Sequence, residues 1–300
     1  MSIVVVGSMA FDSIETPFGK VEKTLGGSAN YFSMSASYFS HINLVGVVGN
    51  DYPMRALENL AGKKIDLAGL QIEEGNTFHW SGKYGYDLND AKTLSTCLNV
   101  FEFFRPELPE GYQSTDFVFL ANIDPELQLH VLSQVNKPKL VACDTMNFWI
   151  ERKLGALKET LAMVDVVLLN EGEARQLSGE HNLLRAAKVI RKLGPQVILI
   201  KRGEYGSLLF DADQIFSVPA MPLEEVYDPT GAGDSFAGGF MGYLSEAGQI
   251  SHDAYRKAVV YGTVMASFCV EDFSFKRLET LSRTDIEERV KSFSQLTNFS

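Results

Sequence analysis

The segment of this sequence most typical of a reaction site consists of three small residues followed directly by an aspartate. Gly231, Ala232, Gly233 and Asp234 open a segment expected to be helical as far as about Ala247. The first N–H groups of a helix have no partner within it, and the helix dipole adds partial positive charge, so this point can hold a phosphate group. Asp234 can then accept the proton of a hydroxyl group that attacks the bound phosphate. The alternative is a glycine-rich turn followed by an Asp that caps the helix.

A second group of polar residues, near the N-terminus, has the chemistry to hold a polyol. Asp12 follows the apolar run Ile3–Val6, and a carboxylate beyond the end of a strand can bind two adjacent hydroxyl groups. Gly26 and Gly27 let the backbone approach a ligand closely, and Asn30 offers both donors and acceptors. These residues are candidates for substrate binding. A turn Asp and an ordinary helix start would explain the same pattern.

Two further segments have residue types that suit a nucleotide and its metal ion. Asn170 and Glu173 are spaced to lie on one helical turn, where an amide and a carboxylate can hold the water molecules of Mg²⁺. The same spacing is that of a capping box, and both interpretations are compatible. Lys201, Gly203 and Gly206 form a glycine-containing turn after a predicted strand.

The composition excludes several classes of partner. The net charge of −11 and the absence of a basic run argue against nucleic acid and anionic membranes as partners. Cys97, Cys143 and Cys269 include no CxxC pair, which predicts reduced thiols and no zinc site. The start of the chain lacks the basic region of a signal peptide, and no apolar run approaches membrane-spanning length. We therefore expect a cytoplasmic protein.

Apolar runs that alternate with helical segments predict how these residues are positioned. The predicted strands are Ile3–Val6, Leu44–Val48, Phe117–Leu120, Leu140–Ala142, Val164–Leu169 and Val197–Ile200. The predicted helices are Ser28–Phe39, Pro53–Ala61, Pro125–Gln134, Leu154–Met163, Glu171–Leu177, Leu183–Leu193, Asp234–Glu246 and Asp253–Phe268. This alternation is typical of an α/β sandwich that binds ligands at the carboxyl ends of its strands.

The aromatic and polar segment from Gly75 to about Arg105 interrupts the alternation. Phe78 and Trp80, and later Leu98 and Val100, alternate with polar residues and predict short antiparallel strands. With Glu15–Val21 they can form a small sheet over the main domain. We expect one domain over residues 1–300 with lid insertions at about 13–24 and 75–105, a lid that excludes water from a reaction site. The alternative is a hairpin that only packs on the core.

These motifs occur in an order that resembles the ribokinase-like, or PfkB-type, family of small-molecule kinases. Residues 228–240 match its C-terminal signature Asp-x-Thr-Gly-Ala-Gly-Asp-Ser-Phe-x-Gly-Gly-Phe. The Gly26–Gly27 pair with Asn30 is similar to the family element that lines the sugar pocket, and Asn170 with Glu173 is similar to its Asn-x-x-Glu motif. Two positions depart from the family pattern, since Pro229 and Lys201 both stand where Thr is usual. Lys201 can meet a phosphate as a point charge.

The resemblance implies a fold and an activity. The fold is a three-layer α/β/α sandwich with a small β-sheet lid, and the activity is ATP-dependent phosphorylation of a hydroxyl group of a sugar or related small molecule. Asp234 would be the catalytic base, and Gly231–Gly233 with Ala232 would form the anion hole. The implied substrate-binding residues are Asp12, Gly26, Gly27 and Asn30. The implied nucleotide-binding residues are Asn170, Glu173, Lys201, Gly203, Gly206 and Thr263. Glu173 would reach Mg²⁺ through water, and Asp228 with Thr230 would hold K⁺.

Alternatives remain for the substrate and for catalysis. The aromatic residues Phe78, Trp80 and Tyr84 can stack on a nucleobase, which makes an adenosine-type nucleoside kinase the second interpretation. A nucleotide-binding relative without activity is a third, against which the intact Asp234 counts. A homodimer formed through the lid is compatible with the family, whose lids serve both monomers and dimers. The sequence does not determine the acceptor, the hydroxyl group that is phosphorylated, the dependence on K⁺ or the oligomeric state.

Overall fold

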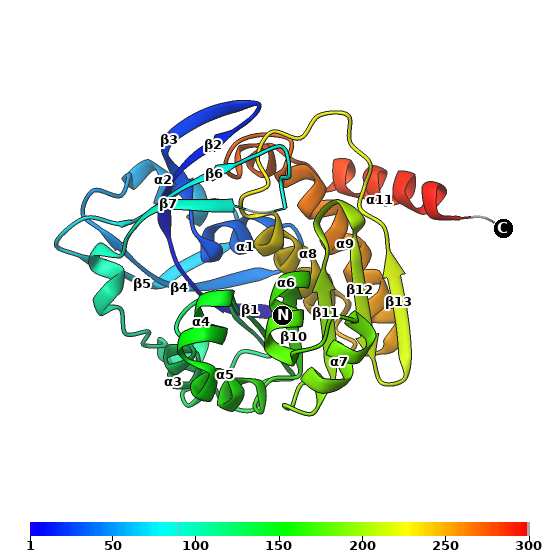
Figure 1. The fold of residues 1–300 in the computed structure, drawn as a ribbon. Coiled ribbons are helices and arrows are strands. Elements are labelled where there is room, and N and C mark those ends of the chain that lie inside the picture. Colours follow the sequence, from blue (N-terminus) through cyan, green and yellow to red (C-terminus); the bar gives the residue numbers. More distant parts are fainter. Residues whose placement is uncertain (90, 299–300) are drawn as a thin grey trace.

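The main sheet of the protein lies between two layers of helices. The structure, a computed structural model, describes residues 1–89 and 91–298, and within them the main sheet has nine strands in the order β13-β12-β11-β10-β9-β8-β1-β4-β5 (Figure 1). From β11 to β5 neighbouring strands are parallel, whereas β12 and β13 are antiparallel. The strand bounds are β1 Ser2–Val6, β4 His41–Gly49, β5 Ile65–Glu73, β8 Phe117–Leu120, β9 Leu140–Asp144, β10 Val166–Asn170, β11 Val197–Lys201, β12 Ser207–Asp211 and β13 Gln214–Val218.

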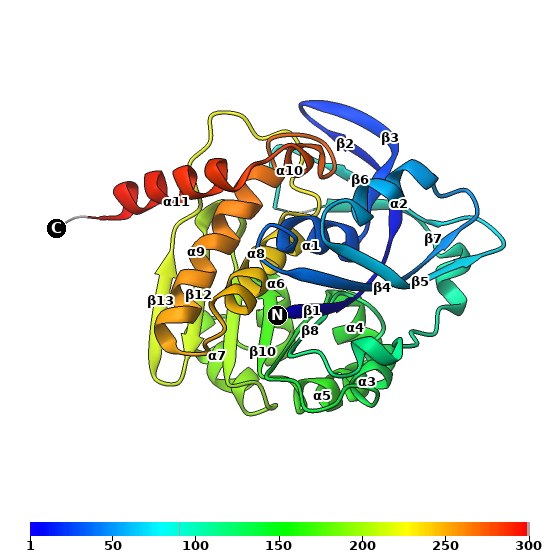
Figure 2. The same cartoon turned by 180° about the vertical axis from the view of Figure 1, so that it is seen from behind.

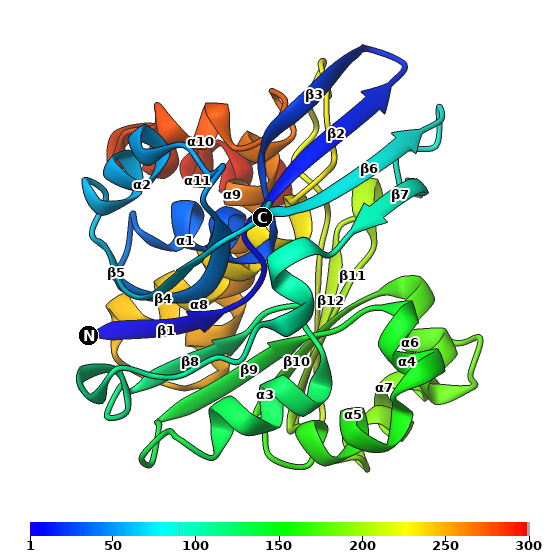
Figure 3. The ribbon, with the colours of Figure 1, turned by 90° about the vertical axis from the view of Figure 1, so that its left-hand side faces the viewer.

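Helices cover both faces of this sheet, so the predicted α/β/α sandwich is confirmed. One layer contains α1 Ser28–Ala36, α2 Met54–Ala61, α8 Ala232–Ala247, α9 His252–Cys269, α10 Lys276–Glu279 and α11 Arg283–Thr297 (Figure 2). The other contains α3 Pro125–Leu132, α4 Asn147–Arg152, α5 Leu154–Leu161, α6 Glu171–Ser178 and α7 Leu183–Arg191 (Figure 3).

Strand β1 illustrates why both faces must be covered. Its Ile3 and Val5 belong to the apolar core shared with α1, α8 and α9, while Val4 and Val6 belong to the core on the other face. All four side chains are fully buried. A run of successive apolar residues therefore has no solvent-facing side, as expected for a strand in a parallel sheet.

A separate sheet of four strands forms the predicted lid. Its order is β3-β2-β6-β7, with β2 Ala10–Thr16, β3 Gly19–Gly26, β6 Phe78–Tyr84 and β7 Ala91–Cys97. It projects beyond the carboxyl ends of the parallel strands (Figure 3). The lid is continuous with the main sheet through the short connection from β1 to β2.

The prediction that Leu98 and Val100 alternate within a strand is wrong. Strand β7 ends at Cys97, and Asn99–Phe103 form a 3₁₀ helix. Asn99 has a left-handed φ of 53°, which turns the chain out of the sheet. The turn brings Val100 into the apolar core against the face of the main sheet.

Several elements were not predicted from the sequence, among them β5, β12, β13, α4 and the last two helices. Strand β5 lies at the edge of the main sheet, and its burial pattern mixes buried with exposed residues rather than forming a continuous apolar run.

Among the described residues, no helix is both long and apolar enough to cross a membrane.

Candidate active site

The carboxyl ends of three neighbouring strands bring charged and polar side chains together. Asp144 ends β9, Asn170 ends β10 and Lys201 ends β11, and Asn170 pairs with Lys201 across the strands. Helix α8 begins at the same edge of the sheet, since Lys201 lies against Gly233 at its start. The topology thus joins motifs that are up to about 90 residues apart in the sequence.

Glycine is required at the start of α8. Gly231 is the N-cap with a left-handed φ of 75°, and a Cβ atom there would lie 2.2 Å from the ring of Tyr31. The Ala232 N–H donates to the carbonyl oxygen of Pro229, at 3.2 Å. Within the described part of the chain, the N–H groups of Gly231, Gly233 and Asp234 make no hydrogen bond. These three donors, rather than that of Ala232, are free for an anion.

The Asp234 carboxyl group lies in the first turn of α8 and is partly exposed. Its pKa is raised to about 7, first by burial and then by the neighbouring Asp144, while Lys201 acts in the opposite direction. A carboxyl group with this pKa exchanges a proton near neutral pH, which suits a general base. Its assignment as the catalytic base stays a prediction.

Lys201 and Asp144 form an ion pair beside the start of α8. Lys201 Nζ lies 2.7 Å from Asp144 Oδ2, and the two side chains are 17% and 6% exposed. Burial lowers the pKa of Lys201, but Asp144, Glu173 and Asp234 outweigh it and raise the pKa above its ordinary value. The ammonium group therefore stays charged.

Asn170 and Glu173 form the capping box at the start of α6. Glu173 N donates to Asn170 Oδ1 at 2.8 Å, and Asn170 N donates to Glu173 Oε2 at 2.7 Å. Asn170 Nδ2 donates to the other carboxylate oxygen, Oε1, at 2.7 Å. Burial and then Asp144 raise the pKa of Glu173 to about 8, while Lys201 lowers it. The capping interpretation is confirmed, and the role in holding Mg²⁺ stays a prediction.

Asp12 and the two glycines lie together where the lid joins the main domain. A Cβ atom on Gly26 would lie 1.8 Å from Asp12 Oδ2, so only glycine leaves room for this carboxyl group. Gly27 has a left-handed φ of 93°, which glycine adopts without strain. Asp12 is 4% exposed, and burial together with Asp228 and Asp234 raises its pKa to about 8.

Asn30 is fully buried in α1 and keeps one acceptor free. Its Nδ2 donates to the carbonyl oxygen of Gly26, at 2.6 Å, and to the hydroxyl oxygen of Tyr52, at 3.0 Å. Its Oδ1 has no hydrogen-bond partner. A buried amide oxygen without a donor costs free energy, so this atom fits a ligand hydroxyl group.

Asp228 lies in a closed loop directly before α8. It is fully buried, and its two carboxylate oxygens accept hydrogen bonds from the N–H groups of Thr230, at 2.9 Å, and Ser274, at 3.2 Å. Burial raises the pKa of Asp228 above its ordinary value. Within the described residues no basic side chain forms an ion pair with it. The negative charge of the Asp228 carboxylate is therefore not neutralised by a side chain, and a bound cation can neutralise it.

The remaining predicted nucleotide residues lie in the turn after β11 and on α9. Gly203 and Gly206 both have left-handed φ values, 52° and 85°. The Asn89 side chain, from the turn between β6 and β7, lies against Gly203, since its Oδ1 is 1.5 Å from the position that a Cβ atom would take. Thr263 is buried, and its hydroxyl group donates to the carbonyl oxygen of Val259, at 2.9 Å. The nucleotide-binding role of these residues stays a prediction.

The three aromatic residues of the lid have different surroundings. Phe78 stacks on Phe101 with ring centroids 5.3 Å apart. Tyr84 is buried, and its hydroxyl oxygen accepts a hydrogen bond from Thr230 Oγ1 at 3.1 Å, which ties the lid to the start of α8. Phe78 and Trp80 are both partly buried, but of these two only the Phe78 ring stacks on another ring among the described residues, so the Trp80 ring is the better placed to contact a ligand.

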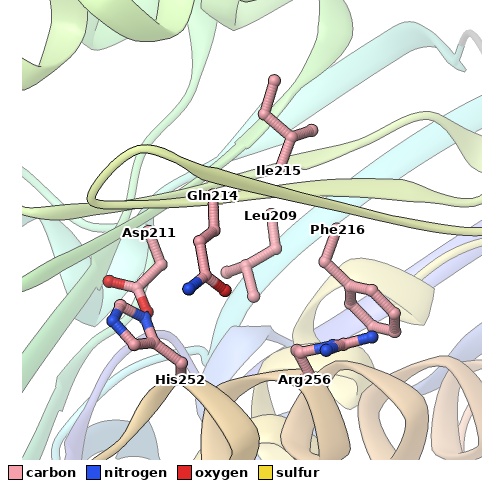
Figure 4. A pocket seen from close by; sticks show the side chains of 7 residues that line it. All are labelled: Leu209, Asp211, Gln214, Ile215, Phe216, His252 and Arg256. Carbon is pink, nitrogen blue, oxygen red and sulfur yellow. The ribbon is translucent and has the colours of Figure 1, made fainter.

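A cavity of about 110 Å³ lies elsewhere, between β12, β13 and the start of α9. In Figure 4 the Asp211 carboxyl group faces the His252 ring, and Arg256 lies against Phe216. None of the predicted site residues lines this cavity, so it is distinct from the predicted site.

Across the described residues, no group of three or more His, Cys, Asp or Glu side chains could hold a metal ion.

Three tyrosines lie beside the predicted site residues, and two of them, Tyr31 and Tyr52, were not predicted as neighbours of the site. Tyr31 packs on Gly231, Tyr52 bonds to Asn30, and Tyr84 bonds to Thr230. The Tyr31 hydroxyl group is buried without a hydrogen-bond partner. The one sequence signal for Tyr31 is its position next to Asn30.

Comparison with known proteins gives consistent matches. The chain matches the family described as pfkB family carbohydrate kinase over residues 1–277. It is 31% identical over 249 residues to a cytidine kinase of Thermococcus kodakarensis, which covers 80% of this chain and 87% of that protein. It is 40% identical over 289 residues to a nucleoside kinase of Methanothermobacter thermautotrophicus, which covers 90% of this chain and 89% of that protein.

A solved structure confirms the predicted fold. The crystal structure of a Methanocaldococcus jannaschii nucleoside kinase, described as an archaeal member of the ribokinase family, matches with a TM-score of 0.76 at 22% identity. The match covers 97% of this chain and 98% of that chain. At this identity the likeness is one of fold.

Proposed function

Because the chain belongs to the pfkB family of carbohydrate kinases, we propose that it transfers the γ-phosphoryl group of ATP to a hydroxyl group of a nucleoside. One observation carries the reaction type: three free N–H groups at the start of α8 adjoin the Asp234 carboxyl group. The donors can stabilise negative charge on the phosphoryl group while Asp234 accepts the proton of the attacking hydroxyl group. The acceptor oxygen forms the new bond to the γ-phosphorus as the bond to the bridging oxygen breaks, and ADP leaves.

The acceptor side is proposed to be formed by Asp12, Gly26, Gly27 and Asn30. Asp12 can bind adjacent hydroxyl groups, and the free Oδ1 of Asn30 can accept a hydrogen bond from one of them. These residues suit the ribose of a nucleoside and a free sugar equally well. The distinction between the two must come from the residues that contact the base.

Trp80 favours a nucleoside. It pairs with Asp12 across the parallel strands β2 and β6, so both side chains lie on the same face of the lid. A Cβ atom on Gly82 would lie 2.1 Å from the Trp80 ring, so the indole covers this glycine, and its N–H donates to Thr93 Oγ1 at 3.2 Å. An indole held in this way can stack on a nucleobase bound beside Asp12. The names of the two relatives point to the same acceptor class, which was the second interpretation from the sequence.

We propose that two cations, Mg²⁺ and K⁺, assist the transfer of the phosphoryl group. Both Glu173 oxygens already accept hydrogen bonds from Asn170, so the pair fits contact with water molecules of Mg²⁺ rather than direct ligation. Mg²⁺ would neutralise charge on the ATP phosphates. The buried Asp228 carboxyl group fits K⁺, with Thr230 beside it. Replacing K⁺ by Na⁺ should lower both the rate and the melting temperature, and equal values in the two salts would count against this cation.

The acceptor can be tested by turnover and by fluorescence together. ADP release is measured with ATP and Mg²⁺ against nucleosides, pentoses, hexoses and polyols. The chain has two tryptophans, so Trp149→Phe leaves Trp80 as the single tryptophan. We expect turnover on a nucleoside and a change in Trp80 fluorescence on its binding. Turnover on sugars alone, with unchanged fluorescence, would move the assignment to a sugar kinase. A cytoplasmic location and a dimer through the lid remain proposals.

A further inference from the structure

The Lys201 ammonium group has donors that the protein does not use. An ammonium group carries three N–H donors. Within the described residues this ammonium group makes one hydrogen bond, to Asp144 Oδ2 at 2.7 Å. The other donors have no protein partner, although the side chain is only 17% exposed. A buried cation with free donors is a binding site for acceptor oxygens.

The position of this ammonium group is determined by the start of α8. A Cβ atom on Gly233 would lie 3.0 Å from Lys201 Nζ, closer than nearly all Cβ contacts, so glycine leaves room for the ammonium group. The free N–H groups of Gly233 and Asp234 lie on the same turn. Lys201 therefore adds a full positive charge to an anion site that otherwise depends on partial charges.

The surrounding charges make Lys201 the cation of this site. Arg202, the next residue, bonds to Glu171 at 2.9 Å, and Glu171 also bonds to Arg175 at 2.6 Å. The carboxyl groups of Glu173 and Asp234, by contrast, form no ion pair within the described chain. The phosphates of a nucleoside triphosphate bound here would lie near several carboxyl groups and, among the described residues, near the ammonium group of Lys201. The binding affinity should therefore depend strongly on that lysine.

We propose that Lys201 is a resident counter-cation for the phosphates of the nucleotide, so that ATP binds here without a divalent ion. The inference rests on the proposed function for the identity of the ligand. The competing explanation is that Lys201 only neutralises the buried Asp144. The two differ in how Mg²⁺ changes the effect of removing the lysine, because a metal ion can replace a counter-cation on the phosphates but cannot repair a broken ion pair.

The test measures ATP binding by calorimetry, once in EDTA and once with Mg²⁺. Lys201→Met removes the charge, Lys201→Arg keeps it, and Lys192→Met is the control, an exposed lysine at the end of α7. We expect Lys201→Met to weaken binding in EDTA by about tenfold or more, which corresponds to about 1.4 kcal/mol or more of binding free energy. With Mg²⁺ the loss should shrink to a few fold. Lys201→Arg should recover most of the affinity, and Lys192→Met should not change it.

Several outcomes would overturn the proposal. These are absence of ATP binding to the unmodified protein in EDTA, equal affinity of Lys201→Met in EDTA, or equal losses with and without Mg²⁺. If Lys201→Met does not fold because Asp144 is left unpaired, Asp144→Asn/Lys201→Met removes both charges and serves in the same measurement. Metal-free ATP binding that depends on Lys201 without turnover on any acceptor would keep this inference and reject the proposed function. Nucleoside turnover without metal-free binding would do the reverse.

Discussion

The two halves of the proposed active site differ in whether their buried carboxyl groups have a basic side chain as partner. On the phosphoryl side, the carboxyl groups of Asp144, Glu173 and Asp234 lie around the Lys201 ammonium group. On the acceptor side, Asp12 and Asp228 are buried without a basic partner in the described structure, and Asp228 contributes to the raised pKa of Asp12. The first half carries its own cation, and the second does not.

This difference indicates which half depends more on its ligands. Burial of a carboxylate without a partner costs free energy, and so does the free acceptor of Asn30. Substrate hydroxyl groups and a monovalent cation would satisfy these groups. The acceptor side should therefore gain the most stability on binding.

The largest expected effect follows removal of the proposed base from the phosphoryl side. Asp234→Asn should lower kcat by about 10²–10⁴ with little change in ATP affinity, because the amide cannot accept the proton. The measurement is ADP release under saturating substrate. Asp253→Asn, an exposed Asp in the first turn of α9, is the matched control and should keep full activity. An Asp234→Asn variant with unchanged kcat would remove Asp234 from the mechanism.

The next largest effect tests how rigidly the start of α8 is built. Gly231→Ala requires a left-handed φ for alanine and places its Cβ atom in the ring of Tyr31. We expect a loss of about 1–3 kcal/mol in the free energy of unfolding, measured in urea, together with weaker ATP binding. Gly155→Ala, in α5 with no atom near the added Cβ, should instead be neutral or stabilising by up to about 1 kcal/mol. Equal stability of the two variants would contradict the geometry described here.

A smaller effect is expected in the pH dependence of the reaction. Burial and Asp144 raise the pKa of Asp234 to about 7, and a base acts only when deprotonated, so kcat/KM should fall about tenfold per pH unit below pH 7 and level off above it. Because Asp144 contributes to the raised pKa, Asp144→Asn should move this limb to lower pH. A limb that stays in place in Asp144→Asn would show that another group controls it.

Much of the phosphoryl side could be predicted from the sequence because its motifs are local. The turn at Gly231–Gly233, the capping box of Asn170 and Glu173, and their order along the chain all follow from neighbouring residues. The buried parallel strands could also be predicted from the sequence, because they are continuous apolar runs. The edge strand β5 was missed because only part of it is buried and it has no such run.

Contacts between distant residues could not be predicted. The ion pair of Lys201 and Asp144 joins residues 57 positions apart, and the hydrogen bond of Thr230 and Tyr84 joins residues 146 apart. Such pairs depend on strand order and on how the lid folds back, which no local pattern encodes. The departure of Lys201 from the family pattern was visible in the sequence, but its partner was not.

The last expected effect concerns the pH dependence of the stability of the acceptor side. The folded-state pKa of Asp12 is about 8, above its ordinary value of 3.8, so the folded protein binds this proton more tightly than the unfolded chain does. The free energy of unfolding should therefore fall as the pH rises from about 4 to 8. Asp12→Asn removes the charge, so its gain in Tm over the unmodified protein should be larger at pH 8 than at pH 5, with about 2–4 °C for each kcal/mol. The same variant should bind nucleoside more weakly, whereas Asp213→Asn, an exposed Asp between β12 and β13, should change neither property. A gain in Tm that is equal at the two pH values would mean that Asp12 is not the uncompensated carboxyl group of this half.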